Sequence, residues 1–412
     1  MKKVLVFLFL FWSAAAYPQS DSLLYSVRGV VRDYDTGKPL QAVAVAAPGT
    51  SIAVITNRDG TFVIKCPSPV ETLNFSLLGY RNMRQATPDA PGKVMSVRMV
   101  RGAFTLDAAT VMTGDPLAIL ALAIERRPYN APDMPELLDC FYRETVQKYQ
   151  RYIYVSEAVT KVYKSEGTGF SVRDRASVVK SRLLTSPRQS DTLGVKVQGG
   201  PAMTVDLDLV KNGGVIIDNE ELQNYHLEMK APEMIDNRMQ FVIGLSPATS
   251  PGYALYNGTV YIDRETLAFT RLELSLDMSK PNLATRVMLV KLPPGIRFKP
   301  KEMSLVLNYN NEGGKTRLSY LRTCFRFNCD WRKRLFATDY TAVAEMVVTN
   351  RYTGAEVARI PRSDTFRSAD ILADKTQYYT DPDFWAAYNI IEPSTSLEHA
   401  LGKLGPSSKP CV

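Results

Sequence analysis

VVRDYDTGKPLQAVAV, residues 30–45, places two apolar runs on either side of a short polar group. Valine and alanine alternate with other residues in these runs, which is typical of strands that bury one face. The polar group contains Asp, Thr, Gly and Pro, the residue types that favour turns. A phosphate-binding loop is excluded, because Arg32 stands where its first glycine belongs and Pro39 follows the lysine. The stretch therefore predicts a turn between two strands.

The same pattern continues on both sides of this stretch, over residues 25–101. Short apolar runs such as SIAVIT, TFVIK and KVMSVRMV are separated by Gly, Pro, Asn and Asp. One connection, NRDG at 57–60, has the glycine of a calcium loop, but the first and last ligand positions would then fall on Ile55 and Cys66. We expect a turn there too. The spacing of the runs predicts a seven-stranded antiparallel sandwich.

Residues 1–16 have the features of a signal peptide: Lys2 and Lys3, then an apolar core, then three alanines. The next apolar run, 116–124, is far shorter than the ~20 residues of a spanning helix. We expect an exported chain without a transmembrane segment after removal of the leader. A formal net charge of +8 suits anionic lipid or polysaccharide better than nucleic acid.

Residues 102–130 read as a linker followed by a helix. Asp115 and Pro116 form a typical helix start, and Leu117, Leu120, Ala121 and Ile124 form one apolar stripe. Pro128 is expected to end this helix. Because the opposite face is rich in alanine rather than in basic residues, we expect a packing helix and not a membrane-surface helix.

Residues 131–392 are predicted to form a larger antiparallel β-rich domain. YIDRETLAFTRLELSLD at 261–277 reads as a hairpin with alternating leucines. For residues 136–164 helix and strand both remain open. A short amphipathic helix is expected within 393–405. The fold class is thus mainly β: an N-terminal sandwich, a linker helix, and a larger α+β domain.

Five cysteines are spread thinly over the chain, which does not indicate a disulfide framework. Cys324 and Cys329 have opposite parity and would face opposite ways on one straight strand. They could pair only if the intervening FRFN formed a turn, and the sequence leaves this open.

The residues favour a protein without catalytic chemistry. His226 and His399 are the only histidines, and neither an HExxH zinc motif nor a GxSxG serine motif occurs. We therefore expect no metal, no cofactor and no enzyme activity. The candidate binding residues are two basic groups that could hold an anionic head group or a sugar acid: Trp331, Arg332, Lys333 and Arg334, together with Arg173 and Arg175. Lys180 and Arg182 extend the second group, and the competing explanation for both groups is a solvated strand edge.

A family resemblance now becomes visible in the quoted stretch. Gly29, Asp33, Thr36-Gly37, Pro39-Leu40, Asp59-Gly60 and Leu78-Gly79-Tyr80 resemble the pattern of the carboxypeptidase-like regulatory domain. This resemblance implies a transthyretin-like sandwich over 25–101 and an exported protein, periplasmic or associated with the outer membrane of a gram-negative bacterium. The rest of the chain resembles the C-terminal part of such exported proteins, which has no assigned activity. Zinc carboxypeptidases carry this sandwich beside a separate catalytic domain, and the two histidines argue against such a domain here.

Three functions remain as hypotheses. The leading one is a non-enzymatic envelope protein that binds a protein or glycan partner. The second is a lipid or lipoprotein carrier, because the helix and successive strands of 131–392 look like the carrier type of half-barrel with an apolar cavity. The third is a hydrolase with an unrecognised carboxylate site. An apolar cavity would favour the carrier, and a cleft with convergent Asp and Glu would favour the enzyme.

Overall fold

The computed structural model describes residues 24–90, 92–102, 114–168, 174–191, 195–197, 199–213, 218–331, 337–367, 370, 372 and 384–406. The expected signal peptide and most of the expected linker lie outside the described residues. None of the helices in this part of the chain is long and apolar enough to cross a membrane.

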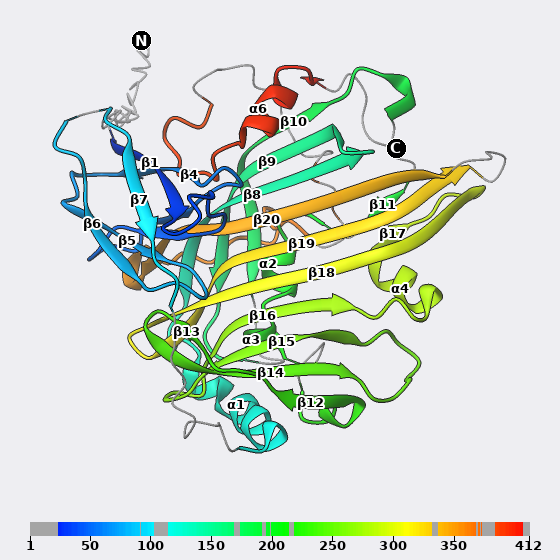
Figure 1. Ribbon diagram of the computed structural model, residues 1–412. Coiled ribbons are helices and arrows are strands. Elements are labelled where there is room, and N and C mark those ends of the chain that lie inside the picture. The colour runs from blue at the N-terminus through cyan, green and yellow to red at the C-terminus, as the bar shows by residue number, and fades with distance from the viewer. Residues whose placement is uncertain are drawn as a thin grey trace, which may run out of the picture.

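The N-terminal part forms the predicted sandwich of two sheets (Figure 1). One sheet has the order β4-β1-β7 and the other β3-β2-β5-β6. Their inward side chains form one apolar cluster centred on Phe62, Ile64 and Phe75. The strands are β1 (Tyr25–Asp33), β2 (Ala44–Ala46), β3 (Ala53–Ile55), β4 (Thr61–Cys66), β5 (Thr72–Ser76), β6 (Met83–Ala86) and β7 (Met95–Met99).

One pair in the sandwich departs from the antiparallel prediction. β7 runs parallel to β1, with Gly29 beside Met95. The chain crosses over from the second sheet after β6, so it enters β7 at the end where β1 begins. Such a crossover depends on contacts between sheets and leaves no signal in local alternation.

The opening stretch is a turn, as predicted. Asp33 Oδ1 accepts hydrogen bonds from the backbone N and the Oγ1 of Thr36, each at 2.7 Å, and Gly37 takes a positive φ of 67°. The other Asp33 oxygen accepts from Tyr80 OH at 2.7 Å and from Arg101 Nε at 3.0 Å. The hydrogen bonds from Thr36, Tyr80 and Arg101 hold the pKa of this carboxyl well below its usual range. Gly37 and its neighbours therefore serve backbone geometry rather than phosphate binding.

The rest of the described chain is built on one twelve-stranded antiparallel sheet (Figure 1). Its order is β12-β14-β15-β16-β18-β19-β20-β8-β9-β10-β21, with β13 paired to β14. Residues 136–164 are thus strands, and 261–277 contains the predicted hairpin of β15 and β16. The strands are β8 (Glu136–Lys148), β9 (Arg151–Lys164), β10 (Arg175–Thr185), β12 (Tyr225–Met229), β13 (Glu233–Ile235), β14 (Arg238–Pro247), β15 (Tyr256–Asp263), β16 (Phe269–Leu276), β18 (Ile296–Glu312), β19 (Lys315–Trp331), β20 (Thr338–Thr353) and β21 (Gly405–Pro406); β11 (Lys196–Val197) pairs separately with β17 (Leu289–Lys291).

The two faces of this sheet have different neighbours. On the helix side, alternate strand residues such as Leu305 and Phe325 pack with Leu120, Leu209 and Met288 of the helices into one cluster. The opposite face, the sandwich side, carries a smaller cluster that includes Ile55 of the sandwich. The helices are α1 (Pro116–Asn130), α2 (Met203–Asp206), α3 (Leu209–Asn212), α4 (Pro281–Met288) and α6 (Thr395–Leu401).

The helix α1 starts as predicted but does not end at Pro128. Asp115 caps it, Leu120 and Ile124 are buried, and the helix continues to Asn130. Proline has no N–H to donate to the carbonyl four residues earlier. Arg127 Nε donates to that carbonyl of Ile124 instead, at 3.3 Å. A neighbouring side chain thus allows the proline to stay inside the last turn. Leu117, expected in the apolar stripe, is exposed.

Residues 384–395, here called the C-terminal clamp, tie the sandwich to the large sheet. Asn389 Oδ1 accepts from the backbone N of Lys65 at 2.8 Å, and Asn389 Nδ2 donates to the Lys65 carbonyl at 2.9 Å. Asp59 of the NRDG turn accepts from Thr395 N at 2.7 Å and from Thr395 Oγ1 at 2.8 Å. Asp59 thereby binds the first turn of α6, which is shorter than the expected 393–405.

The cysteines are buried and unpaired where the structure describes them. Cys66, Cys140, Cys324 and Cys329 are all free. FRFN is not a turn, because β19 runs through it without interruption. Cys324 and Cys329 therefore stay apart, and burial raises the pKa of the Cys329 thiol to about 11.

Candidate functional site

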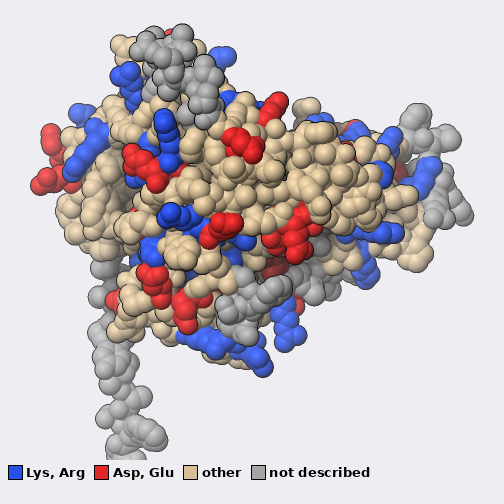
Figure 2. Space-filling view, turned by 90° about the horizontal axis from the view of Figure 1, so that it is seen from below, with Lys and Arg blue, Asp and Glu red and all other residues tan. Residues whose placement is uncertain are grey.

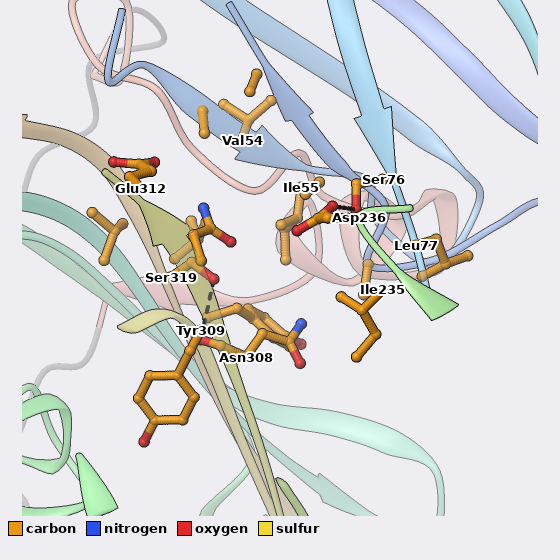
Figure 3. Close-up of a pocket in the computed structure, with 18 of the residues that line it drawn as sticks. Val54, Ile55, Ser76, Leu77, Ile235, Asp236, Asn308, Tyr309, Glu312 and Ser319 are labelled. Atoms are coloured by element: carbon orange, nitrogen blue, oxygen red, sulfur yellow. Dashed lines mark hydrogen bonds between the residues drawn. The ribbon is translucent and has the colours of Figure 1, made fainter. Parts of the chain in front are cut away.

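A cleft lies between the sandwich and the sandwich side of the large sheet (Figure 3). Water-sized molecules can occupy about 100 Å³ of it. We call it the interdomain cleft.

One wall of the interdomain cleft comes from the quoted stretch and its partner strand. In β2 and β3, Val45 and Val54 point into the sandwich core and are fully buried. Because strand side chains alternate, Ala44, Ala46 and Ala53 point the other way and line the cleft. Packed sheets lie about 10 Å apart and fill that gap with side chains. Alanines fill little of it, so the cleft stays open.

The other wall consists of hydrogen-bonding side chains on β16, β18 and β19. Arg271 Nη1 donates to Asn308 Oδ1 at 2.6 Å, and Arg271 Nε donates to Glu273 Oε1 at 2.7 Å. Tyr320 OH donates to Glu345 Oε1 at 2.8 Å, and burial together with that carboxylate raises the pKa of Tyr320 well above its usual value. These contacts hold the polar wall in a fixed geometry before any ligand arrives.

Hydrogen bonds between the two domains bound the cleft at two places. At one end, Ser76 Oγ donates to Asp236 Oδ1, a contact drawn at the right of Figure 3. At the other, Ser51 Oγ lies 2.6 Å from Asn350 Oδ1 and 2.9 Å from the carbonyl of Arg351. These contacts attach the sandwich to the large domain at both ends of the cleft, in addition to the covalent linker.

The rim carries charges of both signs. Glu312 Oε2 accepts from Arg351 Nη1 at 3.1 Å, and Glu312 stands at the left of Figure 3. Figure 2 shows the same mixture on the underside of the molecule, where basic and acidic side chains are interspersed. A ligand that enters the cleft therefore meets no field of a single sign at this rim.

Two carboxylates approach each other beside the polar wall. Burial raises the pKa of the Glu233 carboxyl on β13, and the nearby carboxylate of Glu273 raises it further. Glu273 is already bound to Arg271, and neither carboxylate belongs to the cleft lining. This pair bears on the hydrolase hypothesis, but it does not converge with other acids in the cleft.

The candidate binding residues from the sequence lie elsewhere or outside the described residues. Arg332, Lys333, Arg334 and Arg173 are not described, nor is the side chain of Trp331 at the end of β19. Arg175 opens β10 and donates from Nη1 to the carbonyl of Ile360 at 2.6 Å. Burial and the neighbouring Arg359 and Arg362 lower the pKa of Arg175. Arg175 does not line the interdomain cleft, and the role of these residues stays a prediction.

Lys180 and Arg182 of the same basic group do not form a solvated strand edge. Lys180 Nζ donates to the carbonyl of Phe384 at 2.7 Å and lies 4.0 Å from the centre of that ring. Arg182 Nε donates to Glu157 Oε2 at 2.6 Å and stacks over Trp385. Both side chains hold the C-terminal clamp on the large sheet.

Sequence reasoning missed the residues of the cleft. The signal that it overlooked is the alternation in QAVAVAAPG, where every second residue is as small as alanine on the face away from the core. Large residues at these places would indicate a covered face. Small ones indicate either close packing or an open space, and only the position of the second domain decides between them.

Comparison with known proteins identifies the N-terminal part. Residues 27–111 match the family model described as CarboxypepD_reg-like domain. The sandwich is a CarboxypepD_reg-like domain. This confirms the resemblance seen in the sequence, and it covers only this part of the chain. No curated protein matches the chain.

Solved structures give only distant likenesses. A DUF1329 family protein from Desulfovibrio piger is 10% identical, covers 60% of this chain and 96% of its own, and has a TM-score of 0.26. A LolA superfamily protein from Nitrosomonas europaea is 11% identical, with 62% and 99% covered and a TM-score of 0.21. MucB in complex with MucA(peri) is 11% identical, with 58% and 100% covered and a TM-score of 0.18. Likenesses at these TM-scores support no conclusion about this chain, and the half-barrel stays a prediction.

Proposed function

We propose that this protein is a non-enzymatic binding protein of the cell envelope and that its ligand lies in the interdomain cleft. The observation that carries the proposal is the contrast between the two walls. Ala44 and Ala46 leave room on one side, while Arg271 and Asn308 present polar groups on the other. Proteins and glycans both present many hydrogen-bonding groups, so either class of ligand could bind in a cleft of this kind. The envelope location rests on the signal-peptide pattern and on the regulatory domain.

The lipid-carrier alternative receives less support from the interior of the large domain. A carrier would hold acyl chains on the helix side of the sheet, where the helices pack into the same cluster as the strands. This side also contains a buried ionic group. Lys164 Nζ lies 2.7 Å from Asp174 and from Asp208, and Lys211 Nζ lies 2.8 Å from Asp174. These charges pair with one another, and they make this part of the interior polar, whereas an acyl chain needs an apolar lining.

The proposal is tested by filling the interdomain cleft. In Ala46→Phe an outward-facing methyl becomes a ring in the open space, so the sandwich core is untouched. The control is Ala118→Phe on the exposed side of α1. Residues 17–412 of each variant are screened by biolayer interferometry against a displayed heptapeptide library and an oligosaccharide panel.

We expect a ligand that binds the wild type and Ala118→Phe equally and Ala46→Phe at least about tenfold more weakly, which corresponds to roughly 1.4 kcal/mol. Circular dichroism checks that both variants are folded. The proposal would be contradicted by a ligand whose affinity is unchanged in Ala46→Phe, or by the absence of any binder in both libraries.

A further inference from the structure

Residues 278–301 form a stretch of the large domain that contains no Asp or Glu. They make up α4, β17 and the start of β18. Ala284 and Met288 of α4 are fully buried in the cluster on the helix side of the sheet, which holds this stretch on the domain. In Figure 1, α4 and β17 lie at the right and the sandwich at the left. We call residues 278–301 the basic end. Its cations are Lys280, Arg286, Lys291, Arg297, Lys299 and Lys301.

Three of these cations have no partner in the part of the chain that the structure describes. Arg286, Lys291 and Lys299 are exposed, and among the described residues none of the three forms an ion pair or a side-chain hydrogen bond. Where β11 pairs with β17, Lys291 lies opposite another lysine, Lys196. Cations gathered in this way attract anionic partners.

The carboxylates around the basic end do not cancel its charge. Glu302 and Asp339 each form an ion pair with a basic residue of another strand. Asp330 is only 7% exposed. Asp277 comes directly before the basic end, and it leaves one negative charge beside six positive ones. The exposed field at this place is therefore positive.

Two aliphatic side chains stand in solvent among these cations. Val290 is 41% exposed and Leu292 is 45% exposed. They flank Lys291, and Pro293 favours extended backbone at Leu292. Side chains two residues apart in an extended stretch point the same way, so Val290 and Leu292 share one side. A single exposed leucine is common on protein surfaces, but an aliphatic pair between unpaired cations suits a partner that is both anionic and apolar.

An exposed tyrosine lies at the same end of the large sheet. Lys299 is in register with Asn328, and Asn328 is in register with Asp339. Tyr149 N donates to Asp339 O at 3.2 Å, which places Tyr149 in the same row across the sheet. Tyr149 is 59% exposed. Tyrosine is enriched where membranes meet water, because its ring is apolar and its hydroxyl is polar.

We propose that the basic end docks on the surface of an anionic lipid bilayer. Arg286, Lys291 and Lys299 would bind the headgroups, while Val290 and Leu292 enter the boundary between headgroups and acyl chains. An anionic polysaccharide would use the cations equally well, but it would leave both aliphatic side chains in water.

This docking goes beyond the proposed function, because it uses a different part of the molecule. Lys299 and Asn308 lie on the same strand, β18, and at about 3.3 Å per residue roughly 30 Å separates them. Asn308 lines the interdomain cleft, and no residue of the basic end does. A ligand in the cleft and a bilayer at the basic end can therefore be bound together.

The charge test measures co-sedimentation of residues 17–412 with vesicles. One set of vesicles is phosphatidylcholine alone, and the other is phosphatidylcholine and phosphatidylglycerol in equal parts. The variant replaces the three unpaired cations: Arg286→Gln/Lys291→Gln/Lys299→Gln. The matched control makes the same change of charge at exposed residues of the sandwich: Arg58→Gln/Lys93→Gln/Arg98→Gln.

The apolar test keeps every charge. Val290→Ser/Leu292→Ser removes the two aliphatic side chains from the basic end. Its matched control is Val94→Ser/Val100→Ser on the sandwich, where the two valines are 56% and 44% exposed. Circular dichroism checks that all four variants are folded.

We expect the wild type to bind the mixed vesicles and not phosphatidylcholine alone. The charge variant should bind about a hundredfold more weakly, the apolar variant at least about tenfold more weakly, and both controls like the wild type. Absence of binding to the mixed vesicles, or equal losses in the controls, would overturn the proposal. Loss in the charge variant with an unchanged apolar variant would also overturn it, and binding of soluble dextran sulfate would then identify an anionic polysaccharide as the partner. None of the changed residues lines the interdomain cleft, so each of these failures leaves the proposed function standing.

Discussion

Glu157 is a fully buried carboxylate held between two arginines. Its Oε1 accepts from Arg143 Nε and its Oε2 from Arg182 Nε, each at 2.6 Å. Trp385 Nε1 lies 3.4 Å from the second oxygen. Removing one member of such a group leaves buried charge without a partner, which costs more than the pair itself contributes.

Replacing Glu157 by glutamine should lower the free energy of unfolding by about 3–5 kcal/mol, because two guanidinium groups lose their counter-charge. Urea denaturation followed by circular dichroism measures this. Glu302→Gln is the control, since Glu302 meets Arg326 at 3.2 Å on the surface. An exposed pair of this kind contributes only about 0–1 kcal/mol. Equal effects of the two changes would contradict the assignment.

The same carboxylate gives the stability a pH dependence of known sign. Burial alone would raise the pKa of Glu157, but the charges of Arg143 and Arg182 outweigh it and hold the pKa below the usual value. A depressed folded pKa contributes stability above the unfolded pKa of about 4.3, and this is lost as the pH falls through the folded pKa. Stability of the wild type should therefore drop more steeply below about pH 4 than that of Glu157→Gln, measured by urea midpoints across that range.

Residue-level reasoning from sequence found the basic group on β10 but assigned it the wrong surroundings. For Lys180 and Arg182 the sequence left a binding site and a solvated strand edge open, whereas they contact Phe384 and Trp385, some two hundred positions further along the chain. The turn that contains Asp33, by contrast, was predicted correctly, because the residue that Asp33 binds, Thr36, is only three residues away. Local spacing predicts hydrogen bonds between neighbouring residues, but it does not predict contacts between residues that only the tertiary fold brings together.

At the scale of elements, the C-terminal clamp acts through its aromatic residues. Trp385 packs edge-on against Phe141 of β8 and against Phe384, with ring centres 5.6 Å and 4.4 Å apart. The arrangement places the clamp on the sandwich side of the large sheet, beside Ile55 of the sandwich. The indole of Trp385 therefore packs in a cluster to which both the large sheet and the sandwich contribute side chains.

Trp385→Ala should lower the free energy of unfolding by about 3–5 kcal/mol, the usual cost of deleting a large buried aromatic side chain. Tyr129→Ala on α1 serves as the control, since Tyr129 is 74% exposed. That change should stay within about 0.5 kcal/mol of the wild type. Chemical denaturation of both variants gives the comparison, and a small loss for Trp385→Ala would show that the clamp is dispensable for stability.

Elements with strict alternation were predictable, and those that depend on a partner were not. β1 buries Val27, Val31 and Asp33 in the pattern that its sequence predicts. The interdomain cleft depends on how the outer face of β2 meets β18, and no window of sequence contains both. Pro128 was misjudged for a similar reason, because the side chain of Arg127 supplies the missing donor.

At the scale of the whole molecule, the side chains of Asp59 and Asn389 accept three hydrogen bonds and donate one between the sandwich and the clamp. The double variant Asp59→Ala/Asn389→Ala should let the sandwich open independently of the large sheet. Hydrogen–deuterium exchange should then accelerate at Phe62 and Ile64 but not at Phe141. Equal acceleration in both domains would show that they unfold as one unit despite the lost contacts.

The lining of the interdomain cleft runs from Ala42 to Arg351. A growing polypeptide has the alanine wall early, but the opposing wall of β16, β18 and β19 follows only much later, and the lining is complete only after β20. A chain cut short before β18 would lack most of the wall opposite the alanines. Occupancy of the cleft thus reports that nearly the whole molecule has been made and correctly joined.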